Sequence, residues 1–172
     1  LILPGVGSYP DCKKGLQDIE GLIEVLSEQV IYKKKKFLGI CVGMQLMFDF
    51  SVEKIRTSGF GWLSGYFNKI KVDGLDYLGK NFKVPHMGWN NLNLKHTSHP
   101  ILKNISEKDQ YYFVHSYYLE TSEINQLIAS ANYCHQIPAI VGKENYIGVQ
   151  FHPEKSSFSG QKLISNWLKW NI

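Results

Sequence analysis

One short stretch, in which an apolar run turns sharply into a helix, restricts the fold of this sequence more than any other. Residues 37–40 read Phe-Leu-Gly-Ile, which is typical of a buried strand. Cys41 follows between Gly39 and Gly43, and the apolar residues at 43–50 predict a helix. A strand, a tight turn and a helix in this order are typical of a parallel sheet with crossover helices, so the sequence predicts an α/β fold.

The other elements are predicted from apolar periodicity and from glycine and proline breaks. Residues 1–3 predict a strand, residues 4–10 a loop, and residues 11–32 a helix interrupted near Gly21. Residues 158–170 predict a closing helix. Seven short segments are predicted as strands: residues 66–72, 91–94, 111–114, 117–119, 127–131, 139–141 and 147–151. Strands so closely spaced favour mixed or antiparallel pairing in the second half.

Composition places the chain among globular proteins and excludes several classes. With 172 residues, of which 44% are hydrophobic and 20% charged, it is predicted to form a single domain over residues 1–172. The net charge of +4 accompanies no nucleic-acid-reading motif. No apolar stretch approaches the roughly 20 residues of a membrane helix. Cys12, Cys41 and Cys134 cannot all pair and lack metal-ligand spacing, which favours a reduced, cytoplasmic setting without a metal site.

The chain begins with an apolar segment that is typical of an internal strand. Leu1-Ile2-Leu3 runs into a Pro-Gly turn, and no methionine or signal peptide precedes it. A domain gains little from an unanchored apolar start. We therefore expect the N-terminal portion of the domain, with the first strand or strands of its sheet, to be absent here. Apolar surface is then expected to be exposed near residues 1–3, and the fragment to be poorly stable.

The segment Gly39-Ile40-Cys41-Val42-Gly43 has the spacing of a nucleophile elbow. Small flanking residues allow the sharp bend that holds a nucleophile in a strained conformation. The helix that begins there favours a thiolate at Cys41, and the backbone amide of Val42 can stabilise an oxyanion. A buried structural cysteine is the alternative interpretation of this five-residue pattern.

A second candidate motif, His152-Pro153-Glu154, follows the apolar run at residues 146–151. A histidine at the end of a strand is available as a general base, and a carboxylate two residues later can orient its ring. An isolated His-Pro-Glu is typical of a surface turn. Together with the elbow cysteine, the motif predicts a catalytic triad of Cys41, His152 and Glu154.

The turn Pro4-Gly5-Val6-Gly7-Ser8 ends the first predicted strand. Its glycines allow backbone amides to point at a ligand. No Gly-Lys-Ser/Thr follows, which excludes a phosphate loop, and the spacing of a dinucleotide-binding loop is absent. The turn is therefore interpreted as a set of oxyanion-binding amides.

In this order, the three motifs resemble those of class I, triad-type glutamine amidotransferases. Residues 83–90 (Lys-Val-Pro-His-Met-Gly-Trp-Asn) and 112–117 (Tyr-Phe-Val-His-Ser-Tyr) resemble, more narrowly, the glutaminase subunits of imidazole glycerol phosphate synthase. The resemblance covers residues 1–170. It implies a flavodoxin-like three-layer α/β fold, a mixed sheet with flanking helices whose first strand or strands are missing here.

The resemblance implies a triad that hydrolyses L-glutamine to glutamate and ammonia. Cys41 would attack the side-chain carboxamide of glutamine, His152 would take and return the proton, and Glu154 would orient His152. The implied oxyanion-binding residues are Gly5, Val6, Gly7 and Val42. The implied substrate-binding residues are Gln45, Ser116 and Tyr117. The alternatives are that Gln45 faces solvent and that Ser116 and Tyr117 are an ordinary strand pair.

The resemblance also implies a partner and no cofactor. Ammonia would pass to a (β/α)8-barrel cyclase subunit that forms imidazole glycerol phosphate in histidine biosynthesis, within a heterodimer. The implied contact segment is Pro85, His86, Met87, Gly88, Trp89 and Asn90. His115 is expected to pack beside the site without a catalytic role.

Three other functions remain open from the sequence. A paralogous subunit could supply ammonia for amidation of a bacterial surface sugar. A non-catalytic interaction module could keep the fold, although all three triad positions are filled. A cysteine hydrolase acting on γ-glutamyl bonds would share the elbow but would have no reason to keep residues 85–90.

Overall fold

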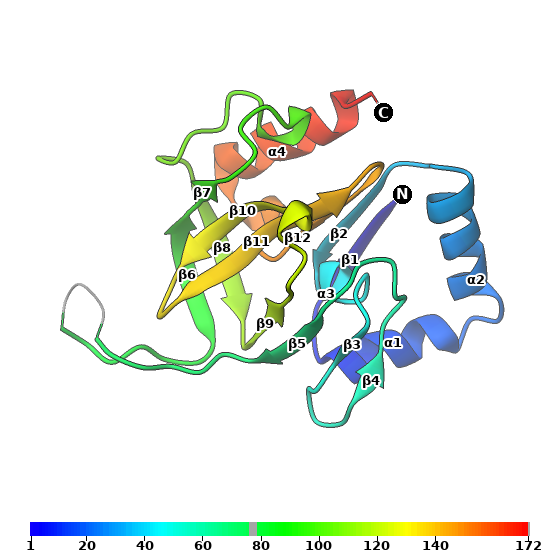
Figure 1. Cartoon of the computed structure of the whole chain (residues 1–172), viewed down its shortest axis with the longest axis horizontal. Helices are drawn as coiled ribbons and strands as arrows, with labels where there is room; N and C mark the ends of the chain where they lie inside the picture. Colours follow the sequence, from blue (N-terminus) through cyan, green and yellow to red (C-terminus); the bar gives the residue numbers. More distant parts are fainter. Residues whose placement is uncertain (76–78, 172) are drawn as a thin grey trace.

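A six-stranded mixed sheet forms the centre of the computed structural model, which describes residues 1–75 and 79–171 (Figure 1). Its strands, in spatial order, are β1 (Ile2–Gly5), β2 (Phe37–Cys41), β12 (Tyr146–Val149), β11 (Gln136–Lys143), β10 (Leu127–Asn132) and β7 (Asn93–Leu94). Strands β1, β2 and β12 are parallel, whereas β11, β10 and β7 pair antiparallel. The predicted α/β fold and the mixed pairing of the second half are confirmed.

Two smaller sheets complete the strand arrangement. One has the order β4 (Thr57–Ser58), β3 (Phe50–Ser51), β5 (Tyr66–Lys69) and β9 (Tyr117–Glu120). The other pairs β6 (His86–Asn91) antiparallel with β8 (Gln110–His115), which sets His86 opposite His115 and Trp89 opposite Tyr112. The segment predicted to contact a partner is therefore hydrogen-bonded to the strand that leads to Ser116.

The helices are short, with one exception at the C-terminal end. They are α1 (Tyr9–Gln17), α2 (Leu22–Ser27), a π-helix (Glu28–Tyr32), α3 (Val42–Gln45) and α4 (Ser157–Lys169). Single 3-10 turns lie at Pro100–Leu102, Ile124–Gln126 and Pro153–Lys155. Gly21, with φ of 73°, separates α1 from α2, as predicted. Within the described residues, no helix is both long and apolar enough to cross a bilayer.

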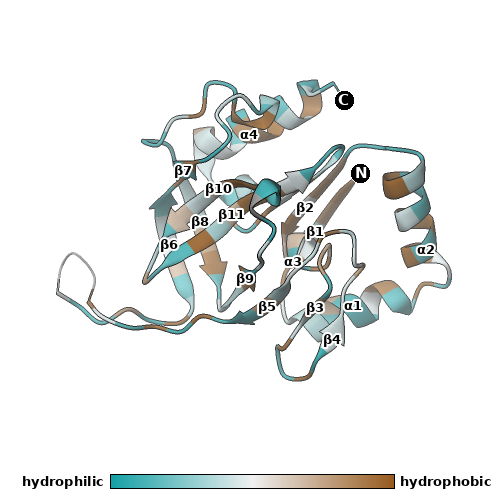
Figure 2. Ribbon diagram, viewed as in Figure 1, coloured by the Kyte–Doolittle hydropathy of each residue, from teal (hydrophilic) through white to brown (hydrophobic). Residues whose placement is uncertain are grey.

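The central sheet separates two apolar cores, because successive side chains of a strand point to opposite faces. On one face, Leu38 and Ile40 of β2 belong to a core that also contains Trp167 of α4. On the other face, Phe37 belongs to a core that contains Met44 of α3. Figure 2 shows the apolar character of β1 and β2 in brown. The sheet is therefore the middle of three layers.

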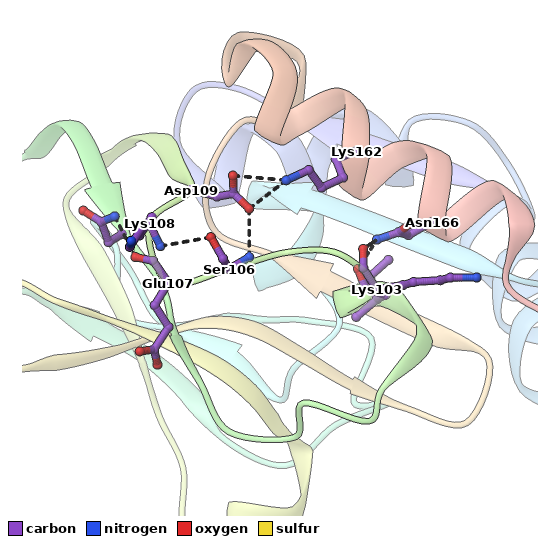
Figure 3. A network of polar contacts seen from close by, with 9 residues as sticks. Lys103, Ser106, Glu107, Lys108, Asp109, Lys162 and Asn166 are labelled. Atoms are coloured by element: carbon purple, nitrogen blue, oxygen red, sulfur yellow. Dashed lines mark hydrogen bonds and ion pairs between the residues drawn. The ribbon is translucent and has the colours of Figure 1, made fainter.

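Polar contacts fasten α4 to the chain that precedes β8 (Figure 3). Nζ of Lys162 donates to both carboxylate oxygens of Asp109, at 3.1 and 2.9 Å. Nδ2 of Asn166 donates to the carbonyl oxygen of Lys103 at 2.7 Å. These bonds fix the position of α4, and with it the turn Pro153–Lys155 that immediately precedes the helix.

The helix predicted over residues 43–50 is wrong in its second half, because α3 has only 4 residues. The carbonyl oxygen of Leu46 accepts a hydrogen bond from the backbone N–H of Phe60 at 2.7 Å. That of Phe48 accepts from the N–H of Gly61 at 3.1 Å. The chain near residue 60 therefore takes carbonyl groups that a longer helix would use for its own ladder.

Strand β6 is absent from the sequence prediction, which places a strand at residues 91–94 instead. Gly88, with φ of 137°, interrupts the pattern, and Asn90 and Asn91 disfavour strands by propensity. The strand is formed through pairing with β8 rather than through its own residues. Tertiary pairing has therefore overridden local preference.

Strand β1 forms an edge of the six-stranded sheet. Leu1 and Ile2 are 46% and 50% exposed, so the apolar exposure expected near residues 1–3 is present. The terminal amine of Leu1 donates to the carbonyl oxygen of Lys36 at 2.7 Å, which aligns this end of β1 with the start of β2.

We expect Gly43→Ala to lower the free energy of unfolding by about 3 kcal/mol, the upper range for overpacking. A Cβ at this position would lie 1.9 Å from the carbonyl oxygen of Leu3. Gly15→Ala is the control, because no atom lies within 4 Å of its added Cβ, and alanine should stabilise α1 by about 1 kcal/mol. Urea unfolding measures both, and equal stabilities of the two variants would contradict the close contact.

Candidate active site

Cys41 lies at the sharp turn where β2 ends and α3 begins. Its backbone φ is 53°, in the left-handed region that residues with a side chain rarely adopt. A Cβ on Gly39 would lie 2.6 Å from the carbonyl oxygen of Gly43, so the bend requires glycine at both flanking positions. The turn has the strained geometry that the elbow motif predicts.

The sulfur of Cys41 is buried and contacts the first of two linked side-chain amides. Cys41 is 5% exposed, and Nε2 of Gln150 donates to its Sγ at 3.7 Å. Nε2 of Gln45 donates in turn to Oε1 of Gln150 at 3.2 Å. Sequence reasoning missed Gln150; the available signal was a single amide in the otherwise apolar run at residues 146–151.

Burial raises the pKa of the Cys41 thiol to about 12. The backbone N–H of Val42 lowers this pKa, and the carboxylate of Glu154 raises it. The thiolate predicted at the helix start is therefore wrong for the free protein, because burial outweighs the dipole of a helix of 4 residues. The thiol is protonated at neutral pH and requires a base.

His152 and Glu154 form a close pair at the end of the neighbouring strand. Nδ1 of His152 lies 2.6 Å from Oε1 of Glu154, and the His152 side chain is 2% exposed. A carboxylate on Nδ1 fixes the tautomer that leaves Nε2 available as a base. Because β12 is parallel to β2, with Val149 level with Ile40, the pair emerges at the same sheet edge as the cysteine.

Three hydrogen bonds anchor the backbone around His152. Its N–H donates to the carbonyl oxygen of Tyr112 at 2.9 Å. Oγ of Ser156 donates to the carbonyl oxygen of His152 at 2.6 Å and accepts from the N–H of Tyr112 at 2.9 Å. The candidate base is therefore fixed to β8.

A cavity of about 200 Å³ opens beside Cys41. Its lining residues are Gly7, Cys41, Val42, Gln45, Glu53, Pro85, Val114, His115, Ser116 and Tyr117. Five of the residues predicted to bind substrate or oxyanion thus gather around one space.

The alternatives for the substrate-binding residues do not hold. Gln45 is 4% exposed, so it does not face solvent. Ser116 lies between β8 and β9, and only Tyr117 is in a strand. Two predicted oxyanion residues lie outside the lining: Gly5 pairs with Cys41 in the sheet, and the side chain of Val6 is 73% exposed.

Glu53 is a cavity residue that sequence reasoning missed. Its Oε2 accepts a hydrogen bond from the backbone N–H of Tyr9 at 2.8 Å, which fixes the carboxylate beside the cavity. Nothing in the local sequence distinguishes this glutamate from a solvated one. In the described ranges, no group of three or more His, Cys, Asp or Glu side chains could hold a metal ion.

Two buried histidines connect the cavity wall to β6, in an orientation set by the carbonyl oxygen of Tyr117. A carbonyl can only accept, so Nδ1 of His115, 2.8 Å away, donates to it. Burial lowers the pKa of His115 to about 4 and that of His86 to about 3, so both rings are neutral. Nε2 of His115 therefore accepts from Nδ1 of His86 at 3.0 Å, and Nε2 of His86 accepts from Nδ2 of Asn90 at 3.2 Å.

The predicted partner contact of His86 requires correction. Its side chain is 3% exposed, and its ring stacks on Phe113 and Tyr133 with centroids 4.7 and 4.1 Å apart. Strand alternation turns Met87 and Trp89 outward instead, where they are 61% and 51% exposed. A pocket of about 700 Å³ is lined by residues 80–90, Asn132 and Tyr133. An apolar surface therefore lies beside the cavity.

Comparison with known proteins gives one family match and many relatives. The chain matches the family Glutamine amidotransferase class-I over residues 1–170. It is similar to the imidazole glycerol phosphate synthase subunit HisH of Rhodospirillum rubrum, at 42% identity over 170 residues, and to that of Brucella suis biovar 1, at 43% over 173 residues. Each alignment covers 99% of this chain and 77% of the relative.

Solved structures share the fold at low sequence identity. A crystal structure of a glutamine amidotransferase has a TM-score of 0.66 at 14% identity. The match covers 96% of this chain and 77% of that chain. PurLQS from Thermotoga maritima has a TM-score of 0.64 at 17% identity, and the match covers 97% of this chain and 78% of that chain. At these identities the likeness concerns the fold alone.

We expect the free energy of unfolding to fall as the pH drops from about 6.5 toward 4, partly through His86 and His115. Burial depresses the folded pKa of both, so in this range the unfolded chain binds protons that the folded chain does not. Each histidine contributes a slope of about 1.4 kcal/mol per pH unit. Urea unfolding at several pH values measures the slope. His86→Phe removes one titrating group and should reduce the slope by about the contribution of one histidine. Equal slopes for the wild type and the variant would contradict the assignment.

Proposed function

The chain belongs to the class I glutamine amidotransferase family, and on that premise we propose that it is the glutaminase subunit of an imidazole glycerol phosphate synthase. In this role it hydrolyses L-glutamine to glutamate and ammonia. The observation that carries the proposal is a buried cysteine on a strained turn, beside a cavity and a His152–Glu154 pair. The HisH relatives support the choice of synthase over the surface-sugar alternative.

The reaction begins with proton transfer from Cys41 to Nε2 of His152. The sulfur then attacks the side-chain carboxamide carbon of glutamine and forms a tetrahedral intermediate. The C–N bond breaks, His152 returns the proton to the departing nitrogen, and ammonia leaves a glutamyl thioester. Water, deprotonated by His152, hydrolyses the thioester to glutamate and restores the thiol. Glu154 stabilises the imidazolium throughout.

Backbone amides stabilise the oxyanion of each intermediate. The N–H of Val42 lowers the pKa of the Cys41 thiol and lies at the start of α3. The turn from Gly5 to Gly7 supplies the second donor, the N–H of Val6. Because β1 pairs with β2 up to Cys41, this turn begins beside the nucleophile.

The cavity fits the amino-acid end of glutamine. The fixed carboxylate of Glu53 has the charge to bind an α-ammonium group. Ser116 and Tyr117 also line the cavity, and Gln45 contributes a side-chain amide. The site therefore recognises a free amino acid rather than an internal peptide residue. A γ-glutamyl compound has the same free amino-acid end, so this feature does not distinguish it from glutamine.

The outward residues of β6 form the proposed contact with a (β/α)8-barrel cyclase subunit. Met87 and Trp89 are exposed and apolar, and Trp89 packs edge-on against Tyr112 with centroids 5.9 Å apart. A partner there would cap the site and receive ammonia before it is protonated in water. The elevated pKa of Cys41 agrees with a subunit that is slow alone and stimulated by its partner.

We expect Cys41→Ala to abolish glutamate release from glutamine by the complete protein and its synthase partner, because no other group can form the thioester. A glutamate assay measures the rate. Cys134→Ala is the control, since Cys134 lies outside the cavity lining and should retain the wild-type rate. Unchanged turnover in Cys41→Ala would refute the triad, and no turnover in any variant would favour the non-catalytic module.

Glu53→Gln should raise the KM for glutamine about tenfold with little change in kcat, because it removes a charge that binds substrate without touching the reacting atoms. The matched control is Glu144→Gln, whose carboxylate is half-exposed and pairs with Lys34. Steady-state kinetics separate the two constants. A fall in kcat alone would exclude the ammonium-binding role.

A further inference from the structure

We propose that Gln150 is a functional residue of this site, whose side-chain amide holds the sulfur of Cys41 with one atom and the side chain of Gln45 with the other. Substrate recognition and the nucleophile are thereby linked through one amide. The inference rests on the proposed glutaminase function and adds to the triad a group that contacts the reacting sulfur.

The backbone places Gln150 level with the nucleophile. Strand β12 pairs in parallel with β2, with Val149 opposite Ile40, so the next residue of each strand is Gln150 and Cys41. The backbone N–H of Gln150 donates to the carbonyl oxygen of Ala139 at 2.9 Å. The side chain therefore extends from a fixed point toward the sulfur.

The two side-chain bonds of Gln150 both involve site residues. Its Nε2 donates to Sγ of Cys41 at 3.7 Å, and its Oε1 accepts from Nε2 of Gln45 at 3.2 Å. Gln150 is 0% exposed and Gln45 4% exposed. Burying an amide is costly unless its polar atoms are paired, and an apolar side chain would suit the strand end without that cost. The two side-chain hydrogen bonds of this amide therefore stabilise the arrangement of the site.

The contact with sulfur favours the reactive form of the nucleophile. An N–H donor pointing at sulfur interacts more strongly with a thiolate than with a thiol, because the hydrogen bond becomes charge-assisted. It also occupies a lone pair, so the S–H proton is directed away from Gln150 and is free to pass to a base. Gln150 opposes part of the effect of burial on the sulfur.

The contact with Gln45 gives the substrate access to the same amide. Gln45 lines the cavity, so a glutamine substrate bound there changes the hydrogen bonds of the Gln45 side chain. A change at Gln45 alters the partner of Oε1 of Gln150, and with it the amide that faces the sulfur. Replacement of Gln150 should therefore affect kcat more than KM, whereas replacement of Gln45 should affect KM.

The test is the reactivity of Cys41 in Gln150→Met, measured in the complete protein together with its synthase partner. Methionine has a similar length and no hydrogen-bond donor. We expect kcat for glutamine hydrolysis to fall about tenfold and the pH profile of Cys41 alkylation by iodoacetamide to shift upward by about one unit. Peptide mass spectrometry separates Cys41 from Cys12 and Cys134.

The matched control is Gln126→Met, in the turn Ile124–Gln126. Oε1 of Gln126 is buried and has no hydrogen-bond partner among the described residues, and Gln126 lies outside the cavity lining. This variant should keep the wild-type kcat and alkylation profile. A shift of equal size in Gln126→Met would show a general effect of replacing a glutamine side chain and would overturn the proposal.

A second substitution covers the case in which Gln150→Met does not fold. Gln150→Glu keeps the size of the side chain but replaces the donor with a carboxylate, which should move the alkylation profile upward by more than one unit. Wild-type kcat and wild-type alkylation in a folded Gln150 variant would overturn the proposal. If wild type releases no glutamate but the alkylation profile still shifts, the glutaminase function fails while the Gln150 contact stands.

Discussion

The close approach of two backbones at Gly43 is the constraint on which the site depends. The first turn of α3 passes so near to the carbonyl oxygen of Leu3 that a single added carbon would lie 1.9 Å from it. This contact lets β1, β2 and α3 converge at Cys41. The glycine turn after β1 and the cavity residues after the elbow all take their positions from that convergence.

The burial of Cys41, the candidate nucleophile, opposes its ionisation. Burial raises the pKa of Cys41 to about 12, which favours the protonated thiol over the more nucleophilic thiolate. The His152–Glu154 pair and the amide of Gln150 lie at the same end of the sheet because β12 is parallel to β2. The topology thus brings the candidate base and the amide of Gln150 to the end of the sheet where Cys41 lies.

The parts of the molecule that the sequence could predict are those encoded by local patterns. The elbow around Cys41, the break at Gly21 and the α/β order follow from glycine spacing and apolar periodicity. The early end of α3 could not be predicted, because the chain near residue 60 competes for its carbonyl groups. Glu53 and the pairing of His86 with His115 likewise depend on which segments meet in space.

The hydroxyl group of Ser156 connects the strand beneath the exposed Trp89 to the segment that carries His152. Oγ of Ser156 bonds both to the carbonyl oxygen of His152 and to the N–H of Tyr112, whose ring packs against Trp89. Strand β8 and the segment that carries the candidate base are therefore held together by hydrogen bonds. The exposed ring of Trp89 is therefore connected to the segment of His152 by consecutive contacts through a single strand.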